Sequence, residues 1–312
     1  MYFLTPVYDM ILIKNTIICQ IMEGLIMRKY IITTESGSDL SQEIIDRYNI
    51  QVVPMHVTME DQTYPDGSFD VQKIFDYYEE TGNLSKTSGS TPQDNYEVFK
   101  RIFAEHPDAY IIHIAYSAVT TVSFNAANIA AKDFKNIFHV DSKHVSVGAA
   151  AIVKATAQFI EDNPNTSPEE IIAFVEDIRE RTHMVFLPKT LLYLKAGGRV
   201  SNLAFYGANL LKIHPSISLE NGYLVSSGKY RGSYESCLKK MFNTFFKNYN
   251  IDPDTVLIVG VPGVEDNQKE MIFDFLREKG IEKAIWMEAG AVISSHGGPE
   301  AIGIAGIEKK AD

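Results

Sequence analysis

The stretch Tyr30-Ile31-Ile32-Thr33-Thr34-Glu35-Ser36-Gly37-Ser38-Asp39-Leu40 decides the fold class. Its first five residues are mostly β-branched and predict a strand, and residues 35–39 predict the turn that leaves it. A short helix is expected next, because four side chains recur at helical spacing: Leu40, Ile44, Ile45 and Tyr48. A strand, a turn and a helix in this order are typical of a βαβ unit with parallel strands.

The same alternation continues through the first half of the chain. Further strands are expected at 51–59, 109–115 and 137–141, and Pro54 favours a sheet edge for the first of them. Helices are expected from Asp70 to Gly82, from Thr91-Pro92, over 123–134, around 148–151, and from the capping box that begins at Ser167-Pro168. This pattern predicts a parallel sheet with helices on its faces.

The second half has a different pattern. Strands are expected at 184–187, 216–220, 223–225, 255–259 and 284–287, with a helix between the last two and another over 190–195 that Gly197-Gly198 ends. Asn221-Gly222 is a strong hairpin signal and therefore predicts antiparallel pairing. We expect two domains: residues 27–185 as a three-layer α/β/α domain with a parallel sheet, and residues 186–312 as an α/β domain with a mixed sheet.

Composition supports an ordinary globular protein. The chain has 312 residues, of which 45% are hydrophobic and 22% charged, so a collagen-like or disordered chain is excluded. The formal charge of −11 opposes nonspecific attraction to nucleic acid. The two cysteines, Cys19 and Cys237, lack the spacing of a metal site, and they favour a reducing cytoplasm over a secreted, disulfide-linked protein.

Residues 1–26 are expected to be an extension outside the fold, either disordered or a consequence of start-site choice. Asp9, Lys14 and Glu23 interrupt its apolar character, so it lacks the run of about 20 apolar residues that spans a bilayer. The first basic residue comes too late for a secretory signal peptide. Met27 is an alternative start.

Common catalytic signatures are absent from the sequence. It contains no GxSxG, HExxH or CxxC motif, and the segment 222–229 fails as a phosphate-binding loop in both spacing and position. The acidic pairs Glu79-Glu80 and Glu169-Glu170 are interpreted as solvated helix surface. His113 and His139 lie in predicted strands, and we interpret them as hydrogen-bonded core residues rather than metal ligands.

Four short polar segments remain as candidate ligand-binding loops: 87–92, 116–121, 197–201 and 294–299. The first precedes a predicted helix start and the second lies between a predicted strand and a predicted helix, and ligands bind at such loops in open α/β sheets. Their hydroxyl and N–H groups could hold an anion, or they could simply cap the helices that follow. His296 lies beside Gly297 and Gly298, which permit close approach of a ligand.

These segments carry a resemblance to the DegV family of bacterial fatty-acid-binding proteins. Six motifs resemble family motifs, in order, over about 285 residues: 33–40 (TTESGSDL), 86–92 (KTSGSTP), 140–143 (VDSK), 193–201 (YLKAGGRVS), 213–222 (IHPSISLENG) and 296–299 (HGGP). The resemblance implies two domains with one long-chain fatty acid buried between them. Carried over to this chain, the carboxylate contacts would be Thr87, Ser88, Thr120 or Thr121, and His296.

The resemblance also implies a partner and the absence of catalysis in this chain. Better-studied family members present the bound acid to a kinase related to dihydroxyacetone kinases, which makes the acyl phosphate. Arg199 would contact that kinase or the phosphorylated head group. No metal or cofactor is implied, and transient contact with a membrane is compatible with taking up a fatty acid.

The chain departs from the family pattern at several of these positions. Gly89 and Ser90 replace Gln-Pro, His214 replaces a lysine, and Glu300 replaces a glycine near the proposed head group, where it would repel a carboxylate unless it is offset. Two alternatives stay open: an enzyme that acts on a small anion with His296 as acid or base, and an interaction module with an empty cleft. Several apolar side chains could line a tunnel or fill the core: Phe186, Leu192, Leu203, Phe205 and Leu210.

Overall fold

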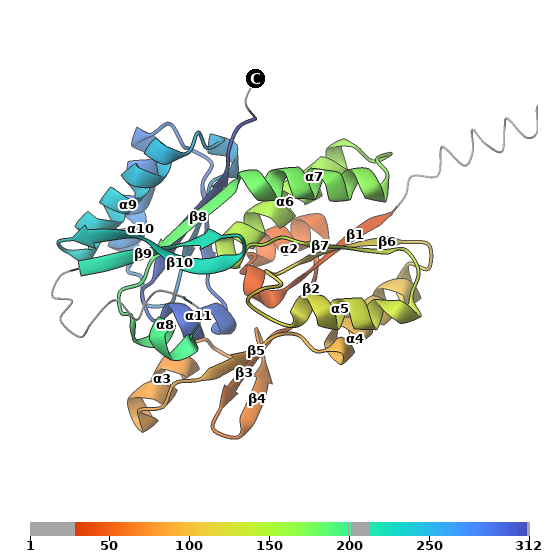
Figure 1. The fold of residues 1–312 in the computed structure, drawn as a ribbon, viewed down its shortest axis with the longest axis horizontal. Coiled ribbons are helices and arrows are strands. Elements are labelled where there is room, and N and C mark those ends of the chain that lie inside the picture. Colours follow the sequence, from red (N-terminus) through yellow and green to blue (C-terminus); the bar gives the residue numbers. More distant parts are fainter. Residues whose placement is uncertain (1–28, 199, 201–212, 311–312) are drawn as a thin grey trace, which may run out of the picture.

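A computed structural model describes residues 29–198, 200 and 213–310 (Figure 1). The expectations for residues 1–26 and for Arg199 lie outside these described residues. Three β-sheets with covering helices make up the described chain: a parallel sheet A, a small antiparallel sheet B and a mixed sheet C. None of the helices in the described ranges has the length and apolar character that crossing a membrane requires.

Sheet A has the strand order β2-β1-β6-β7, and every pair is parallel. Its strands are β1 (Tyr30–Glu35), β2 (Gln51–Val53), β6 (Tyr110–Ala115) and β7 (Ile137–Asp141). The helices around it are α2 (Gln42–Tyr48), α4 (Pro92–Glu105), α5 (Ser123–Ala130), α6 (Ser146–Asp162) and α7 (Pro168–Arg181), with short 3-10 turns at Ser36–Ser38 and Ala131–Asp133.

Alternating side chains of β1 and β6 build the three layers of this unit. Ile31 and Ile111 pack in the cluster that contains α4 and α5, whereas Ile32 and Ile112 pack on the other face with α2, α6 and α7. In Figure 1, α6 and α7 lie above the sheet and α4 and α5 below it. The predicted α/β/α arrangement with a parallel sheet is confirmed.

Sheet C is mixed, as predicted, with the order β10-β9-β8-β13-β11-β12. Its strands are β8 (Thr182–Leu187), β9 (Ile213–Glu220), β10 (Tyr223–Arg231), β11 (Leu257–Gly260), β12 (Ile285–Glu288) and β13 (Ile302–Ile307). Only the β11–β12 pair is parallel among these described strands. The helices are α8 (Leu192–Gly197), α9 (Tyr234–Asn248), α10 (Asp266–Glu278) and α11 (Ala291–Gly297), with a 3-10 turn at Pro253–Thr255.

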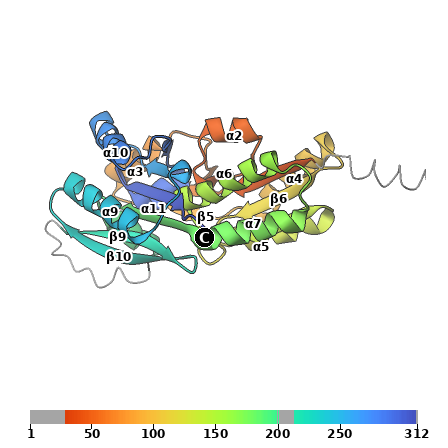
Figure 2. The ribbon, with the colours of Figure 1, turned by 90° about the horizontal axis from the view of Figure 1, so that it is seen from above.

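The two large sheets are joined through α6. One face of sheet C packs on α9 and α10, and the other packs on α6, which contacts β8, β11 and β13. The small residues at 148–151 of α6 permit this approach, because a Cβ on Gly148 would lie 3.0 Å from the Met184 sulfur. The view from above shows α6 between the two halves of the molecule (Figure 2).

Sheet B differs from the sequence prediction. The expected strand over 51–59 divides at Pro54 into β2 of sheet A and β3 (His56–Met59), which pairs with β4 (Gln62–Pro65) and β5 (Lys86–Ser88). Proline lacks an N–H for a sheet ladder, so the chain leaves sheet A there. Helix α3 (Gln72–Thr81) ends at Gly82, as predicted, with a left-handed φ of 71°.

Local signals for turns and helix starts are confirmed. Both Thr91 and Ser167 form reciprocal capping boxes. Asn221 and Gly222 have φ values of 50° and 83° in the turn between β9 and β10, which suits a type I′ hairpin. In contrast, α9, α11, β4, β5 and β13 carry no expectation from the sequence, and residues 294–297, interpreted as a loop, lie in α11.

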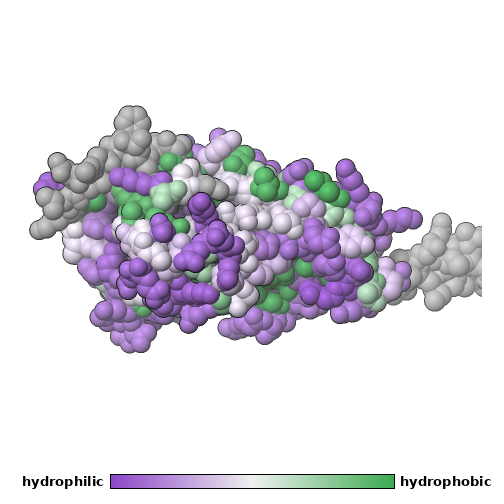
Figure 3. Space-filling view, turned by 90° about the horizontal axis from the view of Figure 1, so that it is seen from below, coloured by the Kyte–Doolittle hydropathy of each residue, from purple (hydrophilic) through white to green (hydrophobic). Residues whose placement is uncertain are grey.

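Five large apolar side chains are exposed among the described residues. They are Val119, Val122, Ile129, Leu192 and Tyr223. The face seen from below is largely hydrophilic, with separate apolar groups among the polar side chains (Figure 3).

Candidate functional site

A cavity lies between the three sheets. Its wall combines the end of β5, the loop after β6, the start of α6, helices α8 and α11, and strands β8, β11 and β13. Most of the lining is apolar and includes Met184, Phe186, Leu194, Val259, Val292 and Ile302. The volume of the cavity is about 90 Å³. The lining side chains that carry a polar group are Thr87, Ser88, Tyr116, Thr120, Thr121, Ser146 and His296.

All five side chains that the sequence assigned to a carboxylate line this one cavity. Thr87 Oγ1 lies 2.7 Å from His296 Nε2, which joins β5 to α11 across 209 positions of sequence. Both side chains are half-buried, whereas Ser88 is exposed. Gly197 approaches His296 from the other side, because a Cβ at that position would lie 2.2 Å from the imidazole Nδ1.

Two buried carboxylates hold the start of α11 and so position His296. Asp39 Oδ1 accepts the Gly290 N–H at 2.8 Å, and Asp66 Oδ1 accepts the Ala291 N–H at the same distance. The other oxygens accept the hydroxyls of Ser146 at 2.5 Å and Ser36 at 2.8 Å. Burial raises the pKa of Asp39 well above its usual range, and the nearby Asp66 raises it further.

Burial likewise raises the pKa of Asp66. The N–H groups of a helix start offset part of the cost of burying these charges, because they point at the carboxylates and carry partial positive charge. The arrangement is therefore a structural clamp between residues that follow β1 and β4 and the helix that lines the cavity.

The loop after β6 presents two hydroxyls with different capacities. The Thr120 hydroxyl donates to the Ser117 carbonyl at 2.9 Å, so its hydrogen is already used. Thr121 Oγ1 instead accepts the Ser123 N–H at 2.9 Å. The Thr121 hydroxyl also lies 2.8 Å from Ser123 Oγ, so among the described contacts it differs from Thr120 in that it does not donate to a backbone carbonyl. Ser117 in turn donates to the Gly222 carbonyl at 2.9 Å, which fixes the hairpin turn against this loop.

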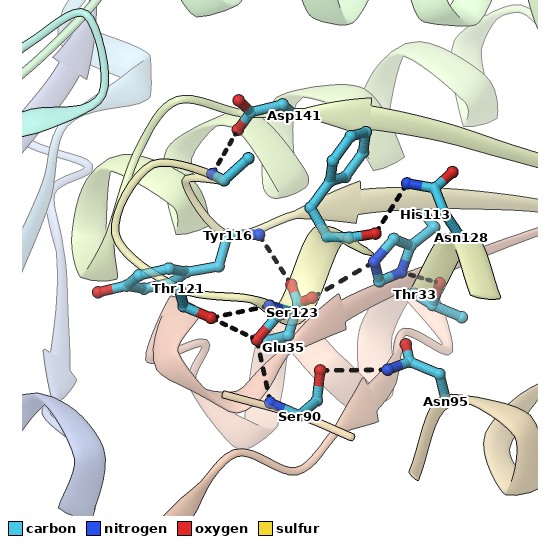
Figure 4. Close-up of polar contacts among 12 residues, drawn as sticks. Thr33, Glu35, Ser90, Asn95, His113, Tyr116, Thr121, Ser123, Asn128 and Asp141 are labelled. Carbon is cyan, nitrogen blue, oxygen red and sulfur yellow. Dashed lines mark hydrogen bonds and ion pairs between the residues drawn. The ribbon is translucent and has the colours of Figure 1, made fainter. Parts of the chain in front are cut away.

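A fully buried acid and histidine lie behind the loop (Figure 4). Glu35 Oε2 accepts the Tyr116 N–H at 2.8 Å, and Glu35 Oε1 lies 3.4 Å from His113 Nε2. The other nitrogen of His113 lies 2.9 Å from the Thr33 hydroxyl. Glu35, His113 and Thr33 have no exposed surface and do not line the cavity, so this network supports the loop from the protein interior.

The structure separates the two histidines that the sequence grouped together. His113 is a hydrogen-bonded core residue, as predicted. The prediction is wrong for His139, because both ring nitrogens are buried without a hydrogen-bond partner. Burial, and then the neighbouring His113, lower the pKa of His139 to about 3. The ring is therefore neutral and packs among aromatic neighbours, including Phe99 and Phe124.

The structure also shows where the acidic pairs and the candidate tunnel residues lie. Glu79, Glu80, Glu169 and Glu170 are exposed helix residues, as interpreted. Within the described ranges, no three His, Cys, Asp or Glu side chains gather as a metal site would require. Of the proposed tunnel residues, Phe186 lines the cavity and Leu192 is exposed. The other three, Leu203, Phe205 and Leu210, lie outside the described residues.

The departures from the family motifs are accommodated locally. Glu300 does not line the cavity, and its carboxylate pairs with Lys189, so it is offset from the head-group site. His214 lies on β9 against the ring of Tyr234 and also stays out of the lining. Gly89 is required by packing, because a Cβ there would lie 2.4 Å from Thr121 Oγ1.

Sequence reasoning missed Asp66 and Ser123. Asp66 lies within Pro65-Asp66-Gly67, which is a turn signal and gives no indication of a contact 225 positions away. Ser123 was expected only as the beginning of a helix. A hydroxyl residue two positions after Thr121 is the one local signal that could have indicated a paired side-chain contact.

Known proteins resemble this chain in sequence and in fold. The family described as "Uncharacterised protein, DegV family" matches residues 29–309. A DegV domain-containing protein of Clostridium perfringens is 29% identical over 284 residues, which cover 89% of this chain and 98% of the relative. One from Clostridium acetobutylicum is 28% identical and covers 91% and 100%.

Solved structures share the fold. A fatty-acid-binding DegV family protein from Thermus thermophilus matches with a TM-score of 0.78 and 24% identity, covering 90% of this chain and all of that one. A DegV family protein from Eubacterium eligens loaded with heptadecanoic acid matches with a TM-score of 0.76 and 20% identity over the same shares. The family match spans nearly the whole described fold, and the chain belongs to the DegV family.

Proposed function

We propose that this protein binds one long-chain fatty acid in the cavity between the sheets, with its carboxylate at Thr87, Ser88, Thr121 and His296. The observation that carries the proposal is the composition of the lining: apolar side chains over most of the wall, and hydroxyls and one imidazole as its polar part. We assign the two sides of the cavity to domains of residues 27–185 and 186–312.

The tail supplies retention rather than selectivity. A sixteen-carbon acid has about 14 methylenes, and burying each from water gains about 0.8 kcal/mol, or roughly 11 kcal/mol in total. A bilayer offers nearly the same gain, so the apolar wall adds little net pull from a membrane. Discrimination therefore depends on the shape of the cavity and on the polar group.

Neutral donors suit a carboxylate that must still react. A buried carboxylate without partners is costly, and converging hydroxyl and imidazole donors offset that cost. Among the described lining residues no lysine or arginine neutralises the head group. This supports presentation of the acid to a separate kinase of the dihydroxyacetone-kinase type, which would form the acyl phosphate in the cytoplasm with its own nucleotide and metal. On this proposal the chain performs no catalytic step, and Arg199 remains the predicted contact of that kinase or of the phosphorylated head group.

The same lining disfavours an enzyme that acts on a small polar anion. Such a substrate would leave most of the apolar wall without a partner, whereas an alkyl chain would cover it.

The test is native mass spectrometry of gently purified protein. We expect a retained mass of a long-chain fatty acid in the wild type, and occupancy reduced at least about tenfold in the double variant His296→Ala/Ser88→Ala, since each lost hydrogen bond to a charged group is worth about 1.5–3 kcal/mol. The matched control is His106→Ala/Ser227→Ala, the same residue types away from the cavity. An empty wild type, or equal occupancy in both double variants, would refute the proposal.

A further inference from the structure

Ser123 has a fully buried hydroxyl that contacts Thr121 (Figure 4), and Thr121 is a residue of the cavity lining. Its Oγ accepts the Ser90 N–H at 3.0 Å and lies 2.8 Å from Thr121 Oγ1. Thr121 Oγ1 also accepts the Ser123 N–H at 2.9 Å. Thr121 lines the cavity, whereas Ser123 does not. The two hydroxyls therefore form a pair with one member inside the site and one member behind it.

The hydrogens of this pair can be assigned by counting donors and acceptors. If Thr121 donated to Ser123, the Ser123 hydrogen would be left in a fully buried position, where the described residues offer it no other hydrogen-bond acceptor. If Ser123 donates to Thr121, every group behind the wall is satisfied. The hydrogen left over then belongs to Thr121, which is half-buried at the cavity surface.

The neighbouring residues hold the pair in this arrangement. Ser90, whose N–H approaches Ser123, is itself held by Asn95, which donates to the Ser90 hydroxyl at 3.1 Å. Gly89 leaves the space that the pair occupies, because a Cβ at 89 would lie 2.4 Å from Thr121 Oγ1 and 2.5 Å from Ser123 Oγ. The glycine that departs from the family motif and the paired hydroxyls therefore depend on each other.

We propose that Ser123 is a positioning residue that turns the Thr121 hydroxyl into a hydrogen-bond donor toward the cavity, and that this donor sets a preference for a carboxylate over a neutral head group. The inference rests on the proposed fatty-acid binding. A hydroxyl that already accepts two hydrogen bonds is polarised for donation, and an anionic oxygen gains more from such a donor than an ester oxygen does.

The experiment compares hexadecanoic acid with its methyl ester as ligands of the delipidated full-length protein. In Ser123→Ala we expect the affinity for the acid to fall about tenfold while the affinity for the ester stays within about twofold. Thr121→Val should lose the preference to the same extent, and the double variant should be no worse than Thr121→Val alone. Ser123→Thr keeps the hydroxyl and should keep the preference.

The positioning role of Ser123 and the binding of a fatty acid would be overturned by different results. Thr156→Val removes another buried hydroxyl, one that donates to the Ile152 carbonyl in α6, and should leave the acid-to-ester ratio unchanged. An unchanged ratio in both Ser123→Ala and Thr121→Val overturns the positioning role even if the wild type binds the acid tightly. If Ser123→Ala does not fold, Thr121→Val alone decides. A wild type that binds neither ligand removes the proposed function itself.

Discussion

His139 and His113 lie opposite each other on β7 and β6, yet their environments differ. The parallel register places Thr33 of β1 opposite His113, and its hydroxyl lies within hydrogen-bond distance of that ring. His139 lies on the outermost strand of sheet A, where its ring meets aromatic neighbours instead. Residue type and strand periodicity predicted two core histidines, but the partner of each depends on strand order, which a single sequence does not show.

The buried neutral state of His139 makes stability depend on pH. Its pKa is about 3 in the folded chain and 6.5 in the unfolded chain, so below pH 6.5 only the unfolded chain binds this proton. As the pH falls below 6.5, the free energy of unfolding should therefore decrease by about 1.4 kcal/mol per pH unit because of this residue. His139→Phe removes this effect. Measured by urea unfolding, the stability of the variant relative to wild type should rise by about 1–2 kcal/mol when the pH is lowered from 7 to 5. A difference that stays constant across that range would contradict the assignment.

At the scale of elements, the sequence predicted those features that adjacent residues determine. Two helix starts and one hairpin were predicted correctly, at Thr91-Pro92, Ser167-Pro168 and Asn221-Gly222, because helix caps and tight turns are formed by residues close in sequence. The three residues of β5 were missed because a strand this short exists only through its pairing with β3. Helix α11 was missed for a related reason. It has only seven residues, and its first N–H groups are satisfied by Asp39 and Asp66, which lie far away in sequence.

That dependence of α11 on distant acids can be measured. Asp66→Ala leaves the buried Ala291 N–H without its acceptor, so the free energy of unfolding should fall by about 1–3 kcal/mol. Asp66→Asn keeps an acceptor oxygen and should cost less. Fatty-acid occupancy should fall with stability, because α11 carries His296. Urea unfolding would be compared with the exposed Asp108→Ala, and equal stability of the two alanine variants would count against the clamp.

At the scale of the whole molecule, the hairpin turn of sheet C touches the loop that follows β6 of sheet A. The Gly222 carbonyl accepts the Ser117 hydroxyl, and a Cβ on Gly222 would lie 2.8 Å from Ser117 Oγ and 2.9 Å from the Val119 side chain. The sequence predicted both the turn and the loop but not their contact, since nothing in either segment encodes how the two sheets are arranged. This contact brings Leu224 and Thr120 to the same cavity.

Gly222→Ala tests the contact between the hairpin turn and the loop, with Gly280→Ala as the matched control. Gly280 has a similar left-handed φ of 76°, against 83° for Gly222, but open space around its Cβ position. Both alanine variants should lose about 1–2 kcal/mol through backbone strain, and Gly222→Ala should lose about 1 kcal/mol more by crowding Ser117 and Val119. Urea unfolding of the two variants gives the difference. Equal losses would mean that the turn and the loop do not constrain each other.

The bond between Thr87 and His296 also has a consequence for biosynthesis. Thr87 emerges from the ribosome long before His296 is synthesised. A nascent or prematurely terminated chain therefore presents Thr87 without its histidine partner, beside an apolar surface that α11 does not yet cover. On our proposal, the fatty acid is therefore bound after translation, and a lipid-loaded chain is one whose synthesis has proceeded through α11.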